Sequence, residues 1–440
     1  MKRFFLIISV SLFCQIAAFA QSIISLKECI ETGLDKNYSI RIIKNDEQIS
    51  SNNATIGNAG YLPTVDFSGG FNGTLYNFDY DYSDGTSEKV KNINNETANL
   101  GINLNWTIFD GFGIQANYSK LKELEQMGML NTRIAIENLV SNITSEYHNL
   151  IRQRIRLNNL NSAVKLSAER LRIVETHYIV GTKSLLDVQQ AKVDYNADSS
   201  RLFKQYETVN SSVIRLNELM GNNSVNQQIT VRDTIILSSS LFNEADLWQK
   251  TIKNNASLLA SNKNKAISEL DYKRILSRNY PYLRLNAGYG YTANWYETGN
   301  TDLQKRLGLN YGVTVGIPIF DGMNRRREQQ NARTQIKNSE LRVQELELFL
   351  KADMSNLWMA YQNNLSLSKL EKENLVLAYE YYEVALVRYK LGELAGIELR
   401  EAQNNLLEAE ERKSIAEYNT KLCEISLLQI SGQIMNYLND

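Results

Sequence analysis

The chain has 440 residues, and its 48 lysines and arginines nearly balance its 49 aspartates and glutamates, giving a formal net charge of −1. This balance does not favour nucleic acid or another polyanion as a partner. Only three prolines occur, so long uninterrupted helices are possible. An internal duplication, described below, indicates one body built from two similar halves rather than several unrelated domains.

The first residues have the pattern of a secretory leader. Two basic residues precede an apolar run at residues 4–13, and small residues end the segment at Ala20. The run is too short to span a bilayer as a mature helix, so we expect residues 1–20 to be a signal peptide cleaved after Ala20. Cys14 would leave with the leader, and the bulky residue before it argues against a lipid-attachment site.

Two cysteines, Cys29 and Cys423, remain in the expected mature chain. Both lie in helical patterns near opposite ends of the sequence. An oxidising compartment would allow them to pair, and the sequence leaves this open.

Four segments alternate apolar and polar residues with a period of two. They lie at about 63–78, 96–109, 282–295 and 307–320. Asn, Gly and Thr fill one face of these segments, with almost no charges. Strands of about nine to eleven residues cross a bilayer at barrel tilt, so the pattern is typical of an outer-membrane barrel. A soluble sheet with one wet face is the alternative.

Four strands cannot close a membrane barrel, because the smallest barrels need about eight and an open edge in lipid leaves backbone groups unpaired. The chain must therefore form an oligomer. Two copies would supply enough strands for a filled barrel, and three would leave a lumen. We expect the polar stretches 79–96 and 296–306 to be loops at the extracellular end.

The remaining sequence is mostly helical in pattern. Two shorter helices are expected at residues 26–36 and 39–58, and four longer ones at about 113–178, 184–220, 323–389 and 396–433. At ~1.5 Å per residue the longest would reach roughly 100 Å, a length that needs coiled-coil partners. We expect a first repeat at 21–220, a linker at 221–242 and a second repeat at 243–440.

Two short motifs occur once in each repeat at a constant offset of 211 positions. In the first, a strand enters a helix through Phe-Asp-Gly, at Phe109, Asp110 and Gly111 and again at Phe320, Asp321 and Gly322. The second is Tyr-x-x-Gly, from Tyr178 to Gly181 and from Tyr389 to Gly392. The repeated order shows that the chain is a tandem duplication.

Nothing in the sequence favours an enzyme. The run beginning at Gly111 fits a dinucleotide fingerprint, but the strand before it alternates, and its twin at Gly322 keeps only the first glycine. We expect both histidines, His148 and His177, to lie on helix surfaces, because no array of metal-ligand spacing accompanies them. The sequence predicts no catalytic residue, metal or cofactor.

This arrangement of leader, duplicated strand pairs and repeated motifs resembles the TolC family of outer-membrane efflux and secretion channels. The resemblance implies an α+β membrane protein, a tandem-repeat protomer that gives four strands to a trimeric 12-stranded barrel. Its long antiparallel helices would form a periplasmic coiled-coil tunnel. The implied partners are two further copies, outer-membrane lipid, a periplasmic adaptor protein and an inner-membrane transporter of the RND or ABC type.

The resemblance also implies roles for residues near Tyr-x-x-Gly. In the family, two acidic residues nine and twelve positions after the second tyrosine narrow the periplasmic end. Here these are Glu398 and Glu401, and Asp187 is the first-repeat equivalent. The tyrosine, Tyr389 with its twin Tyr178, is implied in closed-state contacts. A basic residue also implied in them is replaced here by Leu394. The implied adaptor-facing turns are Gly181, Thr182 and Lys183, and Gly392, Glu393 and Leu394.

Alternatives to an efflux channel stay open at this point. The same fold could serve a type I protein secretion system. A trimeric adhesin anchor and a soluble periplasmic coiled-coil scaffold belong to other classes. The sequence does not distinguish a drug, a metal or a polypeptide as the transported substrate.

Overall fold

The computed structural model describes residues 22–236 and 242–438. The expected signal peptide lies outside the described residues. The chain forms two compact units. One comprises the residues up to Asp46, Leu130–Leu259 and those from Gln344 onward, and the other comprises Glu47–Met129 and Ala260–Val343.

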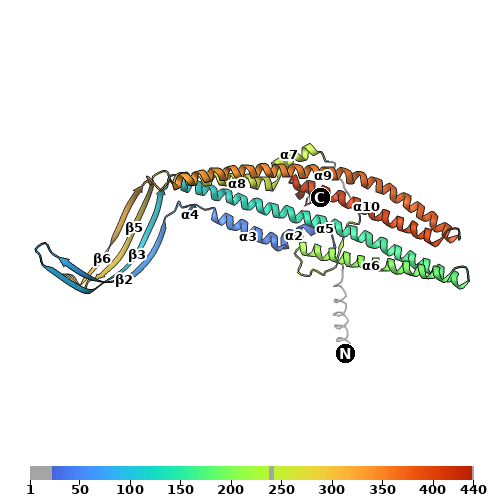
Figure 1. Ribbon diagram of the computed structural model, residues 1–440, viewed down its shortest axis with the longest axis horizontal. Helices are drawn as coiled ribbons and strands as arrows, with labels where there is room; N and C mark the ends of the chain where they lie inside the picture. The colour runs from blue at the N-terminus through green and yellow to red at the C-terminus, as the bar shows by residue number, and fades with distance from the viewer. Residues whose placement is uncertain (1–21, 237–241, 439–440) are drawn as a thin grey trace, which may run out of the picture. The chain divides into compact units, whose positions relative to one another are not determined.

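The second unit contains a four-stranded antiparallel sheet in the order β2-β3-β5-β6 (Figure 1). Its strands are β2 (Thr64–Asp81), β3 (Ser87–Phe109), β5 (Tyr282–Trp295) and β6 (Leu303–Gly316). The pairing joins the first repeat to the second through β3 and β5. Within the described chain, β2 and β6 are therefore the two edges of the sheet.

The two faces of the sheet differ as the alternation predicts. Leu100, for example, lies opposite Gly69 on one side and Tyr291 on the other, within an apolar face. On the polar face Gly101 lies opposite Gly290, and a Cβ atom at Gly101 would come within 3.1 Å of the Gly290 Cα atom. Glycine is required there because the strands approach closely.

The expectation that residues 79–96 form a loop is wrong. β2 continues to Asp81 and β3 begins at Ser87, so only a short turn with Gly85 at φ +86° separates the strands. Loop composition and a reversed alternation beyond Leu75 concealed the strands. The second hairpin differs less: β6 begins at Leu303, inside the expected loop at 296–306, and ends at Gly316.

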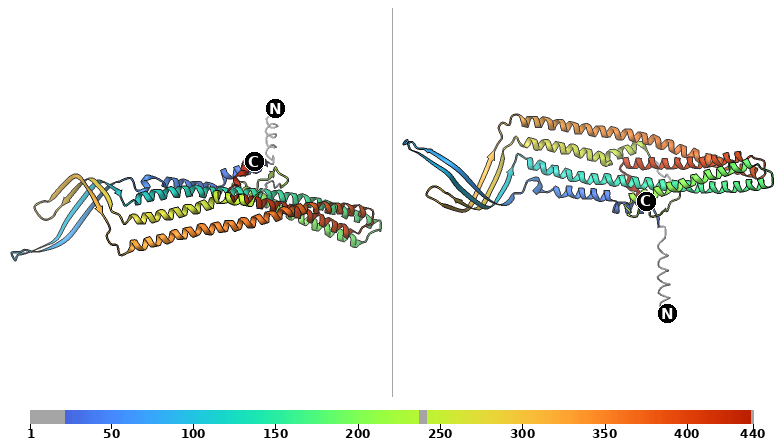
Figure 2. Two further views of the ribbon diagram at one scale, coloured as in Figure 1. Left: turned by 90° about the horizontal axis from the view of Figure 1, so that it is seen from above. Right: turned by 60° about the horizontal axis from the view of Figure 1, so that its bottom comes forward.

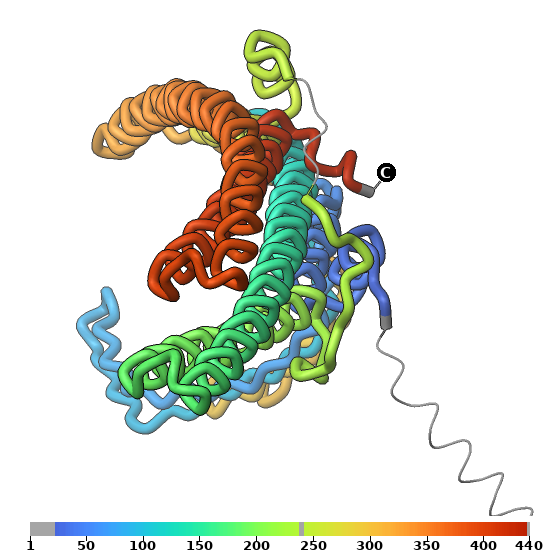
Figure 3. The backbone as a smooth tube through the Cα atoms, turned by 90° about the vertical axis from the view of Figure 1, so that its right-hand side faces the viewer, coloured from blue at the N-terminus to red at the C-terminus, as the bar shows by residue number. Residues whose placement is uncertain are grey.

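Two pairs of helices repeat the same lengths. Helices α5 (Gly113–Ile179) and α9 (Asn324–Lys390) each have 67 residues, and α6 (Leu185–Leu219) and α10 (Gly396–Ile430) each have 35. These ranges lie close to the expected ones. Figure 3 shows α5 with α6 as one hairpin and α9 with α10 as the other. The duplication is therefore structural as well as sequential.

Shorter helices flank the hairpins. They are α2 (Leu26–Lys36), α3 (Tyr38–Asn53), α4 (Ile56–Ala59), α7 (Glu244–Asn254), α8 (Ala256–Ser277) and the 3₁₀ helix η2 (Ile434–Leu438). The expected helix at 39–58 is thus divided into α3 and α4.

Twin asparagines divide the short helices at equivalent places. The side-chain oxygen of Asn37 accepts the backbone N–H of Ile40, at 3.3 Å, and that of Asn255 accepts the N–H of Leu258, at 2.9 Å. Each side-chain NH₂ donates to a carbonyl at the end of a long helix, Leu219 or Ile430, at 2.9 Å. Each asparagine both starts one helix and fixes another.

The segment expected as a linker takes part in the first unit's core. Strand β4 (Ile229–Val231) pairs in parallel with β1 (Ser22–Ile24). Beneath it, Tyr147 is fully buried and its hydroxyl donates to Asp233 at 2.8 Å. Three-residue strands are too short to reveal a period of two. Figure 2 shows this segment beside the N-terminal part of the described chain.

Both cysteines of the described chain and one of its two histidines are buried. Cys29 and Cys423 are free and lie in separate apolar clusters, so they do not pair. Burial raises the pKa of Cys29 to about 12. The expectation of a surface position is wrong for His148, which is 8% exposed and has its pKa lowered to about 4 by burial. His177 is exposed as expected.

We expect Asn37→Ala and Asn255→Ala each to lower the free energy of unfolding by about 1–2 kcal/mol, because each loses a helix cap and a second hydrogen bond. Urea unfolding in detergent measures this. Asn52→Ala is the matched control, because Asn52 accepts only one exposed side-chain bond from Gln48. Equivalent capping would be contradicted if the two asparagine variants lost stability to extents that differed several-fold. It would also be contradicted if Asn52→Ala lost as much stability as they do.

Candidate functional site

The Phe-Asp-Gly motif makes the turn from strand to helix. Asp110 accepts the backbone N–H of Ile114 at 3.0 Å, and Asp321 likewise accepts that of Arg325 at 3.0 Å. Gly111 and Gly322 have φ angles of +72° and +68°. Aspartate therefore caps the helix and glycine supplies the left-handed backbone.

The two copies of this junction differ in their surroundings. A Cβ atom on Gly111 would lie 2.2 Å from the Ser277 carbonyl oxygen. Phe109 packs against Phe112, with ring centroids 5.1 Å apart. In the second copy Phe320 is 72% exposed. The first junction is thus packed within the chain, whereas the second presents its aromatic side chain at the surface.

The Tyr-x-x-Gly motif closes the turns at the far ends of the helical hairpins. Gly181 and Gly392 both have φ +81°, and each donates its N–H to the motif tyrosine carbonyl at 3.0 Å. The next residues, Thr182 and Glu393, donate to the carbonyls of His177 and Arg388, both at 2.9 Å. This is a Schellman turn, which explains the spacing of the motif.

Two expected constriction residues lie at the starts of the return helices. Asp187 accepts the Ser184 hydroxyl at 2.7 Å and backbone N–H at 2.9 Å, and these bonds lower the pKa of its carboxyl. The Glu398 carboxylate accepts the Ala395 N–H at 3.1 Å. Glu401 is exposed one turn further along α10. Asp187 and Glu398 therefore each stabilise the first turn of a helix by accepting the backbone N–H of the residue that precedes it.

The motif tyrosines have different surroundings. Tyr178 is 45% exposed, whereas Tyr389 packs against an apolar cluster that includes Tyr382 and Leu399. Leu394 packs against the same cluster. Burial raises the pKa of Tyr389. The second tip turn is therefore anchored by apolar contacts.

A cavity of about 220 Å³ lies between the two hairpins near these turns. Its lining includes Arg170, Lys183, Asp187, Tyr389 and Arg400, contributed by both hairpins. This cavity brings the expected residues Asp187, Lys183 and Tyr389 together. Glu398, Glu401 and Tyr178 are not among the residues that line it.

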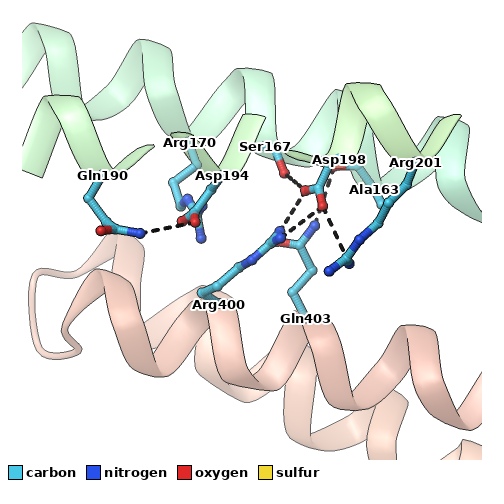
Figure 4. Close-up of polar contacts among 9 residues, drawn as sticks. All are labelled: Ala163, Ser167, Arg170, Gln190, Asp194, Asp198, Arg201, Arg400 and Gln403. Carbon is cyan, nitrogen blue, oxygen red and sulfur yellow. Dashed lines mark hydrogen bonds and ion pairs between the residues drawn. The ribbon is translucent and has the colours of Figure 1, made fainter. Parts of the chain in front are cut away.

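Behind the cavity, a buried ion cluster joins the hairpins (Figure 4). Asp198 on α6 has 1% of its side chain exposed. Its carboxylate accepts hydrogen bonds from both terminal nitrogens of Arg400 on α10, at 2.5 and 2.8 Å. The Ser167 hydroxyl on α5 donates to the same carboxylate. A bidentate, desolvated pair of this kind is geometrically specific.

A second pair extends the cluster toward the tips. Arg170 on α5 has 6% of its side chain exposed and pairs with Asp194 on α6, which also accepts the Gln190 side chain at 3.1 Å. Nearby, Gln403 on α10 donates to the Ala163 carbonyl at 3.3 Å. Charged and polar side chains thus connect α5, α6 and α10 at a place where helices normally pack through apolar side chains.

The charge on Asp198 is kept at neutral pH. Burial opposes ionisation, but the hydrogen bonds from Arg400 and Ser167 and the charges of Arg400 and Arg201 outweigh it and lower the pKa of the carboxyl. A lowered folded-state pKa stabilises the fold above about pH 4, the ordinary aspartate value. This contribution is lost as pH falls through the lower, folded-state pKa.

Sequence reasoning missed this cluster because the duplication does not contain it. Positions 211 residues away from Asp198 and Arg400 hold Ala409 and Gln189. A usable signal was the seven-residue spacing of Ala191, Asp198, Gln205 and Ser212, all buried. An aspartate at a core heptad position indicates a buried partner.

The described residues contain no group of three His, Cys, Asp or Glu side chains placed to hold a metal ion. None of the described helices is both long enough and apolar enough to cross a membrane.

We expect Asp198→Asn to lower the free energy of unfolding by about 3–5 kcal/mol, because it removes the carboxylate that pairs directly with the buried Arg400 side chain. Glu218→Gln, which breaks an exposed pair with Arg215, is the control and should change little. The double change Asp198→Leu with Arg400→Met should recover most of the loss. Thermal unfolding in detergent measures all three, and a small effect of Asp198→Asn alone would contradict a closed ion cluster.

Comparison with known proteins identifies the family. The model of the outer membrane efflux protein family matches residues 30–222 and 247–433. The outer membrane protein TolC of Vibrio cholerae is 21% identical over 305 residues, 68% of each chain. The solved outer-membrane channel OprN is 16% identical, with a TM-score of 0.77 over 93% of this chain and 90% of its own. The solved outer membrane protein VceC of Vibrio cholerae is 15% identical, with a TM-score of 0.74 over 92% of this chain and 96% of its own.

The structural likenesses confirm the tandem-repeat α+β fold, and the family match confirms the resemblance drawn from the repeated motifs. Because the match spans both repeats, the chain belongs to the outer membrane efflux protein family, whose members are outer-membrane channels rather than enzymes.

Proposed function

We propose that three copies of this chain form a channel whose shared barrel has twelve strands. The observation that supports this most directly is the sheet β2-β3-β5-β6, which has an apolar face and two edges without a partner in the described chain. Backbone groups of an open edge are costly in lipid, so the edges must meet those of other copies. Three copies leave a lumen, and the polar face lines it.

The duplication supports one particular register between β6 of one copy and β2 of the next. Within the chain, Asn105 on β3 lies opposite Asn286 on β5. The two repeats are offset by 211 positions at the Phe-Asp-Gly motifs and by 218 positions upstream, as between Asn37 and Asn255. These offsets convert Asn105 into Gly316 and Asn286 into Ser68. We infer that Gly316 lies opposite Ser68 of the partner subunit, and that the other pairs of this interface follow the same register.

The polarity of the two strands supports this register. It sets Leu309 opposite Leu75 of the partner subunit, and Val313 opposite Phe71 of the partner subunit, so apolar residues lie beside apolar residues. Further outward it brings Lys305 beside Asp79 of the partner subunit, an attractive pair. A shift of one residue would instead set the apolar residues of one strand opposite the polar residues of the other.

We expect the variant carrying Gly316→Cys and Ser68→Cys to form a covalent trimer on mild oxidation, since both substitutions lie in one chain and each joins a different neighbour. Non-reducing electrophoresis shows the products. Gly316→Cys with Asn72→Cys is the control, because Asn72 lies on the same face but four residues away in register. Efficient trimer formation by the control, with none by the first variant, would overturn the register.

The long helices are proposed to continue the channel through the periplasm. Exposed apolar side chains on α9, such as Phe349, Leu377 and Val384, and on α6, such as Phe203, offer contacts to neighbouring copies. We propose that the tip turns at Gly181–Lys183 and Gly392–Leu394 meet an adaptor protein that couples the channel to an inner-membrane transporter. The family match and the exposure of Gly181–Lys183, Gly392 and Glu393 support this efflux role.

We propose that Glu398 and Glu401 narrow the periplasmic end as rings of three like charges. Glu398→Ala with Glu401→Ala should weaken cation preference and block by multivalent cations in planar bilayers, because fewer negative charges line the narrowest point. Gln403→Ala, a buried position on the same helix, serves as the control for altered packing. Unchanged selectivity and block in a correctly assembled double variant would remove these residues from the constriction.

A further inference from the structure

The β2–β3 hairpin reverses its polarity along its length. Up to Leu75, the odd-numbered residues of β2 are mainly apolar and belong to the apolar face of the sheet. Beyond that point, the odd positions hold Asn77, Asp79 and Asp81. The even positions, on the face that is polar lower down, now form an aromatic ladder: Tyr76, Phe78, Tyr80 and Tyr82.

The ladder is an ordered surface. Its successive ring centroids lie 4.5, 5.0 and 6.0 Å apart. Across the hairpin, the register sets Ile93 opposite Tyr76 and Val90 opposite Phe78, which widens the apolar strip. The Tyr82 hydroxyl donates to Glu88 at 3.0 Å, and the Asn95 side chain donates to the Tyr76 hydroxyl. These contacts fix the ladder at both ends.

The opposite face of the same segment is polar and exposed to solvent. Asp79 and Lys89 form an ion pair at 3.1 Å with about two-thirds of each side chain exposed. The reversal coincides with a β-bulge between Tyr76 and Phe78, where Asn92 has φ +58° and donates its N–H to Asn77 at 2.6 Å. A bulge bends a strand and increases its twist, so it marks a change of environment along the hairpin.

Three of the four ladder residues remain exposed within the described chain. Phe78, Tyr80 and Tyr82 are 37%, 42% and 49% exposed. Residues 87–95 of β3 extend past the last residue paired with β5, which corresponds to about 30 Å of strand. Figure 2 shows this hairpin running on beyond the β5–β6 hairpin.

The position of the ladder in the proposed channel indicates which surface can cover it, and this step rests on the proposed function. The even-numbered residues of β2 face the lumen, so the ladder faces the three-fold axis at the end remote from the helices. Lipid cannot cover it, because the lipid-facing residues lie on the other side of the hairpin. Three hairpins around one mouth turn identical aromatic surfaces toward one another.

We propose that the aromatic ladders of the three copies pack against each other above the membrane and narrow the outer mouth of the channel. The partner of each ladder is thus a second copy of this chain. Packing removes apolar surface from water, and the polar outer face with Asp79 and Lys89 keeps the assembled tip soluble.

A cysteine on each face of the hairpin tests this. Tyr80→Cys places a thiol on the ladder, and Asp79→Cys places one on the polar face one residue away. Mild oxidation in outer membranes should cross-link most Tyr80→Cys chains between copies and at least fivefold fewer Asp79→Cys chains. The native Cys29 and Cys423 are buried and contribute no background.

Conductance gives a second measurement that needs no cross-link. Tyr80→Ser with Tyr82→Ser should raise single-channel conductance at least twofold, whereas Asp81→Ser, on the polar face, should leave it near the native value. Equal cross-linking from both faces, or none from Tyr80→Cys together with unchanged conductance, overturns the inference. If the Gly316→Cys with Ser68→Cys variant still forms a covalent trimer, the proposed channel survives that failure.

Discussion

The backbone groups at the edges of the β2-β3-β5-β6 sheet constrain the rest of this molecule. An unpaired N–H or C=O costs several kcal/mol in hydrocarbon, and each edge strand carries a row of them. One chain supplies four strands, too few to close a barrel. The apolar face can therefore enter a membrane only if the sheet edges pair with those of other copies. In this account the channel exists only in the oligomer.

The duplication makes this assembly economical. Inside the chain, the second strand of one repeat pairs with the first strand of the next, and the proposed trimer uses the same pattern between chains. The twin caps at Asn37 and Asn255 and the twin turns at Gly181 and Gly392 show how closely the repeats match. The buried pair of Asp198 and Arg400 does not follow the repeat. It joins the first hairpin to the second where the proposed channel narrows.

The sequence predicted those parts that rest on long periods or repeated motifs. The strand at 282–295 and the four long helices extend over many residues, so their periodicity outweighs local exceptions. The outer half of the β2–β3 hairpin was missed because its polarity reverses at Tyr76 and its composition suggests a loop. His148 was misplaced because a histidine inside a long helix gives no sign of which face is buried.

The candidate site was predicted less completely. Tyr389 and Asp187 do line one cavity, but Asp198, Arg400 and Arg170 came from the structure alone, since ion pairs between distant helices have no local signature. The constriction role of Glu398 and Glu401 stays a prediction. A capping role explains Glu398 equally well, because carboxylates in a first helical turn are stabilised by the helix itself.

The central claim is that the sheet edges are satisfied only between copies. Light scattering of the detergent-extracted protein, corrected for bound detergent, measures the number of chains in each particle most directly. The account predicts particles of three chains extracted from the outer-membrane fraction. A monomer, or quantitative recovery in the soluble fraction without detergent, would contradict it.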